Sequence, residues 1–270
     1  MPVRKRLDVL LLEMGLAESR EKAKAIIMSG IVYANNQKAD KAGTTYTEDT
    51  VIEVRGDTLP YVSRGGLKLE KAIDVFNIDL KDAVAMDIGA SHGGFTDCML
   101  QNGAAKVFAI DVGHGQLVWK LRQDPRVINL ERTNFRYVTS EQITEPIDFF
   151  SVDVSFISLK LILPVAHRFL KNGGTAVCLI KPQFEAGREL VGKNGIVRDP
   201  KVHEAVITDI LAFLVQNGYS VLGLSHSPIK GTHGNIEYLV YISKSDDPKT
   251  AEGISPRTVV EDSHNILDVK

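Results

Sequence analysis

The sequence predicts an α/β fold: a doubly wound, mostly parallel sheet with helices on both faces, preceded by a small α+β module. Two observations lead to this fold class. From residue 67 onward, continuous apolar runs alternate with helical segments, which is the pattern of buried parallel strands joined by crossover helices. The first sixty residues instead combine two short helices with short alternating strands, and Pro60 and Gly65–Gly66 interrupt the periodicity between the two parts.

The N-terminal module, residues 1–60, opens with a predicted helix that ends at Gly15. Its expected apolar face carries Leu7, Leu10, Leu11 and Met14. A second helix begins after Ser19, which we expect to be its N-cap, and ends at Gly30. The runs "IVYANNQKA" and "DTVIEV" then predict a strand leading into a turn and a further strand.

The larger part, residues 67–245, contains the apolar runs "AVAMDIG", "AKVFAIDVG", "DFFSVDVSF" and "TAVCLIKPQF", which predict strands. Helical segments stand between them, including "FTDCMLQNG", "QLVWKLRQD" and "HEAVITDILAFLVQNG". Trp119 has helical spacing with Leu117 and Leu121, so we expect it to pack in the core. The runs "YSVLGLSHSPI" and "IEYLVYISK" follow each other without a helix, which predicts a hairpin and an antiparallel strand at the sheet edge. Residues 61–66 are expected to form a linker, and residues 246–270 a loosely attached polar tail.

The composition indicates an ordinary cytoplasmic, soluble protein. The chain has 270 residues, a net charge of −2 and 44% hydrophobic residues, so any nucleic-acid surface must be local. Asp8 and Glu13 break the apolar N-terminal stretch, and no segment predicts a membrane span. Cys98 and Cys178 are expected to be reduced, and no histidine pair has the spacing of metal ligands, so we expect no metal.

The stretch "MDIGASHGGFTD", residues 86–97, predicts a ligand-binding turn between a strand and a helix. Its glycines, Gly89, Gly93 and Gly94, do not have the spacing of a dinucleotide dehydrogenase. Asp87 ends the first strand, and Asp111 ends the second, where a carboxylate can accept hydrogen bonds from ribose hydroxyls. This arrangement suits a cofactor with a cationic, non-phosphorylated end, such as S-adenosylmethionine; the alternative is a tight turn with no ligand.

Four charged residues flank other strands of the predicted sheet. Lys68 lies in the helix before the first strand, Asp153 and Lys181 end two later strands, and Glu237 precedes the last strand. Because ligands of an open α/β sheet sit beyond the carboxyl ends of its strands, we expect these side chains to converge there. Each one alone has an ordinary explanation as a solvated strand end.

This set resembles the Lys-Asp-Lys-Glu tetrad of FtsJ-like ribose 2′-O-methyltransferases. The strings "SRGGLKLEKA", "DVSFISL", "IKPQFEAGRELVGKNGIVRD" and "IKGTHGNIEYL" are specifically similar to the TlyA family. The resemblance implies a Rossmann-like class I methyltransferase fold with seven strands, and methylation of cytidine in 23S rRNA, with 16S rRNA as a further candidate. It implies that Lys181 is the base, that Lys68 orients the hydroxyl, and that Asp153 and Glu237 position the two ammonium groups. The implied S-adenosylmethionine site comprises Asp87, Gly89, Ser91, Gly93, Gly94, Phe95, Asp111 and Asp153.

The first sixty residues resemble the small RNA-binding domain first named from ribosomal protein S-four. That resemblance implies a ribosomal RNA or ribosomal-subunit partner, gripped through its phosphates by a basic surface. We expect this surface to include Arg4, Lys5, Arg6, Arg20, Lys22, Lys24 and, in the linker, Arg64. The alternative is an ordinary solvated face. Asn36 stands where the domain usually has glycine, and asparagine also tolerates a positive φ.

Three functions remain open from the residues: this enzyme, a non-catalytic RNA- or ribosome-binding protein, and a membrane-lytic protein, since the family often carries haemolysin labels. The intact tetrad argues against the second, and the lack of a basic amphipathic segment argues against the third. Ser155, Arg188 and Lys193 are expected in loops near the tetrad, as RNA contacts or as solvated residues. His92 replaces the family's usual threonine, and we interpret it as a substitution without a catalytic role. We expect a monomer.

Overall fold

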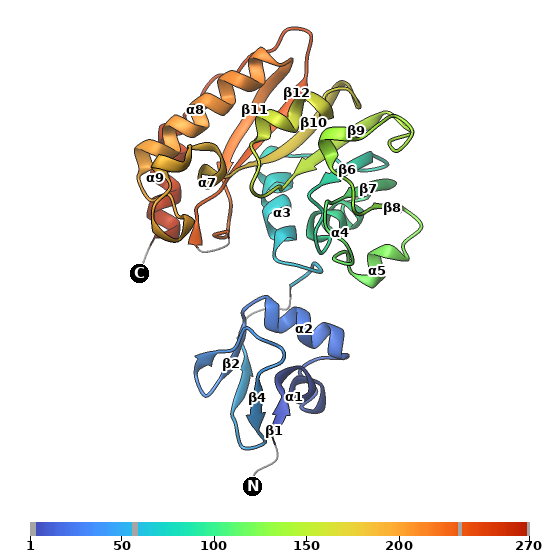
Figure 1. Ribbon diagram of the computed structural model, residues 1–270, viewed down its shortest axis with the longest axis vertical. Coiled ribbons are helices and arrows are strands. Elements are labelled where there is room, and N and C mark those ends of the chain that lie inside the picture. Colours follow the sequence, from blue (N-terminus) through green and yellow to red (C-terminus); the bar gives the residue numbers. More distant parts are fainter. Residues whose placement is uncertain (1–3, 56–58, 232–233, 269–270) are drawn as a thin grey trace. The chain divides into compact units, whose positions relative to one another are not determined.

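The computed structural model describes residues 4–55, 59–231 and 234–268. The chain divides into two compact units, Met1–Arg64 and Gly65–Lys270 (Figure 1). Each unit has its own buried core and is described by itself.

The smaller unit packs two helices, α1 (Leu7–Glu13) and α2 (Arg20–Met28), onto short strands. Strand β1 (Arg4–Arg6) pairs with β4 (Thr45–Thr47), while β2 (Val32–Ala34) lies between β3 (Gln37–Lys38) and β5 (Ile52–Val54). Ser19 caps α2 as predicted, because its hydroxyl accepts a hydrogen bond from Lys22 N. The prediction for Met14 is wrong: it lies just past the end of α1 and is 49% exposed, whereas Leu7 and Leu11 are fully buried.

The hairpin between β2 and β3 turns at Asn35 and Asn36, which have φ values of 48° and 64°. Two successive left-handed residues match the right-handed twist of the flanking strands. Asparagine tolerates this conformation, so Asn36 preserves the turn that a glycine would make.

The larger unit is built on one seven-stranded sheet with the order β11-β12-β10-β9-β6-β7-β8, which confirms the predicted α/β class. The parallel strands β6 (Val84–Ile88), β7 (Lys106–Ile110), β8 (Val127–Leu130), β9 (Ile147–Val152) and β10 (Leu170–Ile180) form its centre and one edge. Strand β12 (Tyr238–Lys244) is antiparallel to both β10 and β11 (Tyr219–His226). The antiparallel strand β12 therefore lies second from the edge, and not at the edge as predicted. The second strand of the final hairpin, β12, inserts between β10 and the first strand of that hairpin, β11.

Helices α3 (Gly65–Phe76) and α4 (Gly94–Gln101) pack on each other, α3 against β12 and α4 against β7. Helices α8 (Pro200–Gln216) and α9 (Pro256–Leu267) also pack together, and both contact β11. Figure 1 shows α8 and α9 side by side. The connections also hold three one-turn helices: α5 (Trp119–Arg122), α6 (Leu163–Ala166) and α7 (Pro182–Glu185). Short 3₁₀ turns cover Phe135–Tyr137, Leu159–Leu161, Arg188–Leu190 and Lys193–Gly195.

The C-terminal segment is not a loosely attached tail, so that prediction is wrong. Ser255 caps α9 by accepting a hydrogen bond from Thr258 N, and Pro256 occupies its first turn. Val260 is 2% exposed and belongs to the main hydrophobic core. The apolar pairs Val259–Val260 and Ile266–Leu267 of this helix are separated by a polar stretch, so the composition of the segment did not indicate a buried face.

Trp119 also differs from its prediction, since it is 63% exposed. Leu117 and Leu121 fill the packed positions on either side of it. Because α5 is a single turn, it presents only a narrow buried face, and Trp119 lies outside that face.

Candidate active site and cofactor loop

The four predicted tetrad residues converge within the larger unit. Lys68 Nζ lies 2.6 Å from Glu237 Oε2 and 3.4 Å from Asp153 Oδ2. Lys181 Nζ lies 2.5 Å from Asp153 Oδ1. Lys68 comes from the first turn of α3, Asp153 and Lys181 directly follow β9 and β10, and Glu237 directly precedes β12. The Asp153 carboxylate therefore connects the two lysines, and the carboxyl ends of the sheet bring the cluster together.

The cluster is buried and alternates in charge. Lys68 and Lys181 are each 7% exposed, and Glu237 is 2% exposed. Burial alone lowers the pKa of Lys68, but the Asp153 and Glu237 carboxylates outweigh it, so the pKa lies above its ordinary value. Burial likewise raises the pKa of Asp153, but Lys68 and Lys181 bring it below its usual range. Lys68 and Asp153 therefore carry fixed, opposite charges at neutral pH.

Lys181 and Glu237 line a cavity of about 600 Å³, which is within the range of small-molecule sites. Lys181 Nζ also lies 3.4 Å from Ser155 Oγ and 5.8 Å from the centre of the Phe184 ring. Of the predicted loop residues, Ser155 and Arg188 line the cavity. Lys193 is exposed and is not among the lining residues, although its neighbours Gly192 and Asn194 are.

Two aromatic residues that sequence reasoning missed form part of the cavity wall. Phe156 is 90% exposed, and its ring centre lies 5.0 Å from that of Phe184. Phe156 also has a φ of 63°, a strained conformation for a bulky residue. A large exposed ring on a strained backbone does not stabilise the fold. The Phe156 ring is therefore available to contact a ligand.

Polar residues of the cavity wall were also missed. Asn235 holds the loop before α8: its Oδ1 accepts a hydrogen bond from Val197 N at 3.1 Å, and its Nδ2 donates to Gly195 O at 2.9 Å. Gln183 Nε2 donates to Glu237 Oε1 at 3.5 Å, while its Oε1 is buried without a hydrogen-bond partner. Gln183 lies two positions after Lys181, and Asn235 lies two positions before Glu237. This proximity to the tetrad is the sequence feature by which both could have been identified.

The glycine turn follows β6 and begins α4, as predicted. Gly89 and Gly93 have φ values of 92° and 93°. A Cβ on Gly89 would lie 2.5 Å from Asp153 O, and one on Gly93 would lie 2.3 Å from a Leu121 methyl carbon. Glycine is therefore required at both positions, and Gly89 brings the turn into contact with the tetrad at Asp153.

Asp111 connects the glycine turn to the loop after β7. Its Oδ2 accepts a hydrogen bond from Ser91 N at 2.8 Å, and its Oδ1 accepts one from Gly113 N at 2.7 Å. Val112 beside it is 71% exposed, an apolar surface next to a carboxylate. An acidic group for ribose hydroxyls beside an apolar surface for a base fits an adenosine-type ligand such as S-adenosylmethionine. The buried Gly93, Gly94 and Phe95 shape this turn from within.

Asp87 differs from its predicted role. It is fully buried, its Oδ2 accepts hydrogen bonds from Thr96 N at 2.9 Å and Thr96 Oγ1 at 2.6 Å, and its Oδ1 accepts one from Ser151 Oγ at 3.2 Å. The side chain therefore fixes the first turn of α4 from beneath the loop and does not offer its oxygens to a ligand. Burial raises the pKa of Asp87 to about 7, against the hydrogen bonds that lower it.

Asp87→Asn should change how stability depends on pH. The pKa of Asp87 rises from 3.8 to about 7 on folding, so the folded protein retains a proton that the unfolded chain releases. Its contribution to stability is complete below pH about 4 and is lost as the pH rises to about 7. Urea denaturation measures the free energy of unfolding of both proteins. We expect the value for Asp87→Asn minus the value for the wild type to increase as the pH rises through this interval. A difference that stays constant or decreases contradicts this assignment.

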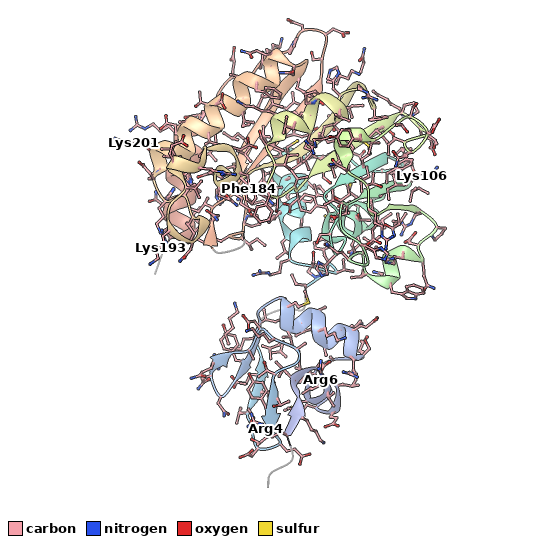
Figure 2. The ribbon with its side chains drawn as sticks, in the orientation of Figure 1. Arg4, Arg6, Lys106, Phe184, Lys193 and Lys201 are labelled. Atoms are coloured by element: carbon pink, nitrogen blue, oxygen red, sulfur yellow. The ribbon has the colours of Figure 1, made fainter. Side chains whose placement is uncertain are left out.

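The smaller unit carries all seven basic residues predicted to bind RNA. Six of them are exposed: Arg4, Arg6, Arg20, Lys22, Lys24 and Arg64. Lys5 is half-buried, and its Nζ lies 2.8 Å from both Glu13 and Glu48, while Lys22 pairs with Glu18. Figure 2 shows Arg4 and Arg6 on this unit. The surface therefore presents cations, several of them held by a neighbouring carboxylate.

A sheet of this order, with a glycine turn after its central strand and a charged cluster beside that turn, is the architecture of S-adenosylmethionine-dependent methyltransferases. Residues 61–244 match the sequence profile of the FtsJ-like methyltransferase family, and the chain belongs to that family. Residues 5–52 match the profile of the S4 domain, the RNA-binding domain that the first sixty residues resemble.

Relatives place the chain more narrowly. It is 52% identical over 271 residues to YqxC of Bacillus subtilis, covering 99% of this chain and 96% of YqxC. It is 39% identical to the 16S/23S rRNA (cytidine-2′-O)-methyltransferase TlyA of Mycobacterium tuberculosis, covering 94% of this chain and 96% of TlyA. The chain therefore belongs to the TlyA family.

A solved Streptococcus thermophilus structure with a hemolysin name superposes with a TM-score of 0.80 at 51% identity, covering 99% of this chain and 98% of that chain. Within the part of the chain that the structure describes, none of the helices combines the length and the apolar character that a bilayer span requires.

Proposed function

We propose that this protein transfers a methyl group from S-adenosylmethionine to the ribose 2′-hydroxyl of a cytidine in ribosomal RNA, acting on 23S rRNA, with 16S rRNA as a further candidate substrate. The observation that carries this proposal is the contact between the glycine turn and the tetrad, where Gly89 approaches the Asp153 backbone. A cofactor in the turn then lies beside the cavity that Lys181 and Glu237 line. The function named for TlyA of Mycobacterium tuberculosis supports the substrate. Such a protein acts in the cytoplasm, where ribosomal RNA is available.

The tetrad divides the chemistry between its residues. S-adenosylmethionine supplies a reactive methyl group on a sulfonium, which is an excellent leaving group. Lys181 Nζ, on the wall of the cavity, takes the proton of the 2′-hydroxyl as general base, an effect typically of about 10²–10⁴-fold. Asp153 orients the Lys181 amine through its 2.5 Å contact. Lys68 stays protonated between two carboxylates and fixes the hydroxyl's position by its charge.

The cavity wall supports a nucleotide substrate. Phe156 and Phe184 offer aromatic faces on which an unstacked base can rest, the usual means of holding a single RNA base. Gln183, on the same wall, donates through Nε2 to Glu237 Oε1 and so helps to hold the carboxylate that pairs with Lys68. Arg188, on the same wall, provides a cation for a neighbouring phosphate. Arg4, Lys5, Arg6, Arg20, Lys22, Lys24 and Arg64 of the smaller unit bind structured RNA through its backbone.

Methyl transfer in vitro tests this function. Purified protein is incubated with ribosomal subunits from a strain that lacks the gene and with S-adenosylmethionine labelled in its methyl group, and the RNA is digested to nucleosides. We expect the label in 2′-O-methylcytidine. Label on a base atom, or a protein that neither binds the cofactor nor transfers the methyl group, contradicts the proposal; the second result points to a non-catalytic RNA-binding protein.

His92→Thr should retain methyl transfer. The His92 ring is exposed, and its Nδ1 lies 3.2 Å from Ser91 Oγ, within the glycine turn and apart from the tetrad. Its backbone belongs to the turn, while the imidazole has no proton to move in the proposed reaction. We expect kcat and the KM for S-adenosylmethionine to stay close to the wild-type values. A near-total loss of activity would give the imidazole a role in catalysis.

A further inference from the structure

The smaller unit buries a carboxylate beneath its basic surface. Asp8, in the first turn of α1, is fully buried. Arg6 donates to it through Nε at 2.9 Å and through Nη2 at 3.2 Å, and Arg20 donates through Nη2 at 2.9 Å. The two arginines come from different elements, since Arg6 ends β1 and Arg20 begins α2. One carboxylate therefore holds two cations, one from the strand before α1 and one from the helix after it.

The two guanidinium groups are held but not covered. The side chain of Arg6 is 47% exposed and that of Arg20 is 53% exposed, whereas Asp8 is inaccessible. Arg6 uses two nitrogens on Asp8, the fork geometry that fixes the plane of a guanidinium group. Hydrogen bonding from Arg6 lowers the pKa of Asp8 to about 2, against the effect of burial, so this carboxylate is ionised at neutral pH.

A carboxylate such as Asp8 is not what charge alone would favour on an RNA-binding surface. An acidic residue among cations lowers the positive potential, and a buried charge is unfavourable unless it is fully paired. Asp8 compensates by removing conformational freedom from two long side chains. An arginine that is already ordered loses less entropy when it binds a phosphate, so its contact contributes more to affinity.

We propose that Asp8 is a positioning residue that presents Arg6 and Arg20 to RNA as one fixed pair. The inference rests on the proposed function, in which the smaller unit binds ribosomal RNA. It differs from a general basic surface because the affinity depends on a residue that contacts no RNA and carries the same charge as RNA.

Asp8→Asn tests the inference, because positioning and charge predict opposite results. The full chain is titrated with 23S rRNA from a strain lacking the gene. We expect about tenfold weaker binding, although the surface becomes more positive, since both arginines must then be ordered on binding. The matched control is Glu53→Gln, which removes the same charge from the same unit, where Glu53 pairs with Arg55 Nε at 3.0 Å. We expect the control to bind as tightly as the wild type or more tightly. Asp8→Asn binding as tightly as the wild type overturns the inference.

Two further variants separate the possible failures. If Arg6→Ala and Arg20→Ala both bind 23S rRNA like the wild type, the proposed RNA surface is wrong, and the inference fails with it. If both arginine variants bind weakly while Asp8→Asn binds normally, only the positioning role is wrong.

A spectroscopic measurement reports the arginines directly. In nuclear magnetic resonance spectra of the free protein, the Nε–H signal of Arg6 and the Nη–H signals of Arg20 should be resolved and slow to exchange. In Asp8→Asn we expect both to exchange rapidly with water. If Asp8→Asn does not fold, Arg6→Lys decides the question, because it keeps the charge and loses the two-nitrogen contact. We expect Arg6→Lys to bind RNA several-fold more weakly, and unchanged binding overturns the inference.

Discussion

Lys181→Ala should lose methyl transfer by about 10²–10⁴-fold while still binding S-adenosylmethionine, because the variant removes the proposed general base and leaves the glycine turn intact. Lys181 Nζ lies on the cavity wall and contacts Asp153, whereas the turn is built by Gly89, Gly93 and the Asp111 carboxylate. Single-turnover rates with ribosomal subunits measure the first effect, and calorimetric titration with S-adenosylmethionine measures the second.

Lys171→Ala is the matched control for this prediction. Lys171 lies on the same strand, β10, and its Nζ contacts Asp148 Oδ1 at 2.5 Å in an exposed ion pair. Exposed pairs of this kind contribute little to stability, so we expect wild-type rates. A Lys181→Ala enzyme that reacts as fast as Lys171→Ala would show that Lys181 is not the base.

Gly89→Ala should abolish tight binding of S-adenosylmethionine and, with it, activity. A methyl group at this position would lie 2.5 Å from the carbonyl oxygen of Asp153, which is backbone and cannot rotate away. The positive φ of 92° adds strain of about 1–2 kcal/mol for a residue with a Cβ. The turn and the tetrad must then separate, which moves the cofactor away from Lys181. Calorimetric titration and thermal unfolding with and without S-adenosylmethionine measure the effect.

Gly173→Ala is the control that separates the effect of backbone strain from the effect of the steric clash in Gly89→Ala. Gly173 has a φ of 74°, but a Cβ there meets no atom within 4 Å. We expect this variant to lose stability by a similar backbone strain and to bind the cofactor normally. If Gly89→Ala and Gly173→Ala bind S-adenosylmethionine equally well, the approach of the turn to Asp153 has no role in the site.

The tetrad could be predicted because parallel strands place their carboxyl ends at one edge of a sheet. Asp153 and Lys181 end strands that are recognisable as apolar runs, so their convergence followed from topology alone. The role of Asp87 could not be predicted in this way. A strand-end acid faces a ligand or the interior depending on its neighbours, and here Thr96 and Ser151 direct it inward.

Other features depend on packing that a single sequence does not display. The buried face of α9 rests on Val260 and Ser263 within a charged segment, so its composition resembled a tail. Strand β12 lies second from the edge because it inserts between β10 and β11. The apolar run of β12 is compatible with both an edge and an inner position. The strained backbone of Phe156 has no local sequence signal, because left-handed conformations are rare for aromatic residues.

The most direct test of the proposed function is nucleoside mass spectrometry of ribosomal RNA from cells that lack the gene, carry the wild-type gene, or carry Lys181→Ala. We predict a 2′-O-methylcytidine in ribosomal RNA that is present with the wild-type gene and absent from the other two strains. Identical ribose methylation in all three strains would contradict the assignment of this protein as a ribosomal RNA 2′-O-methyltransferase.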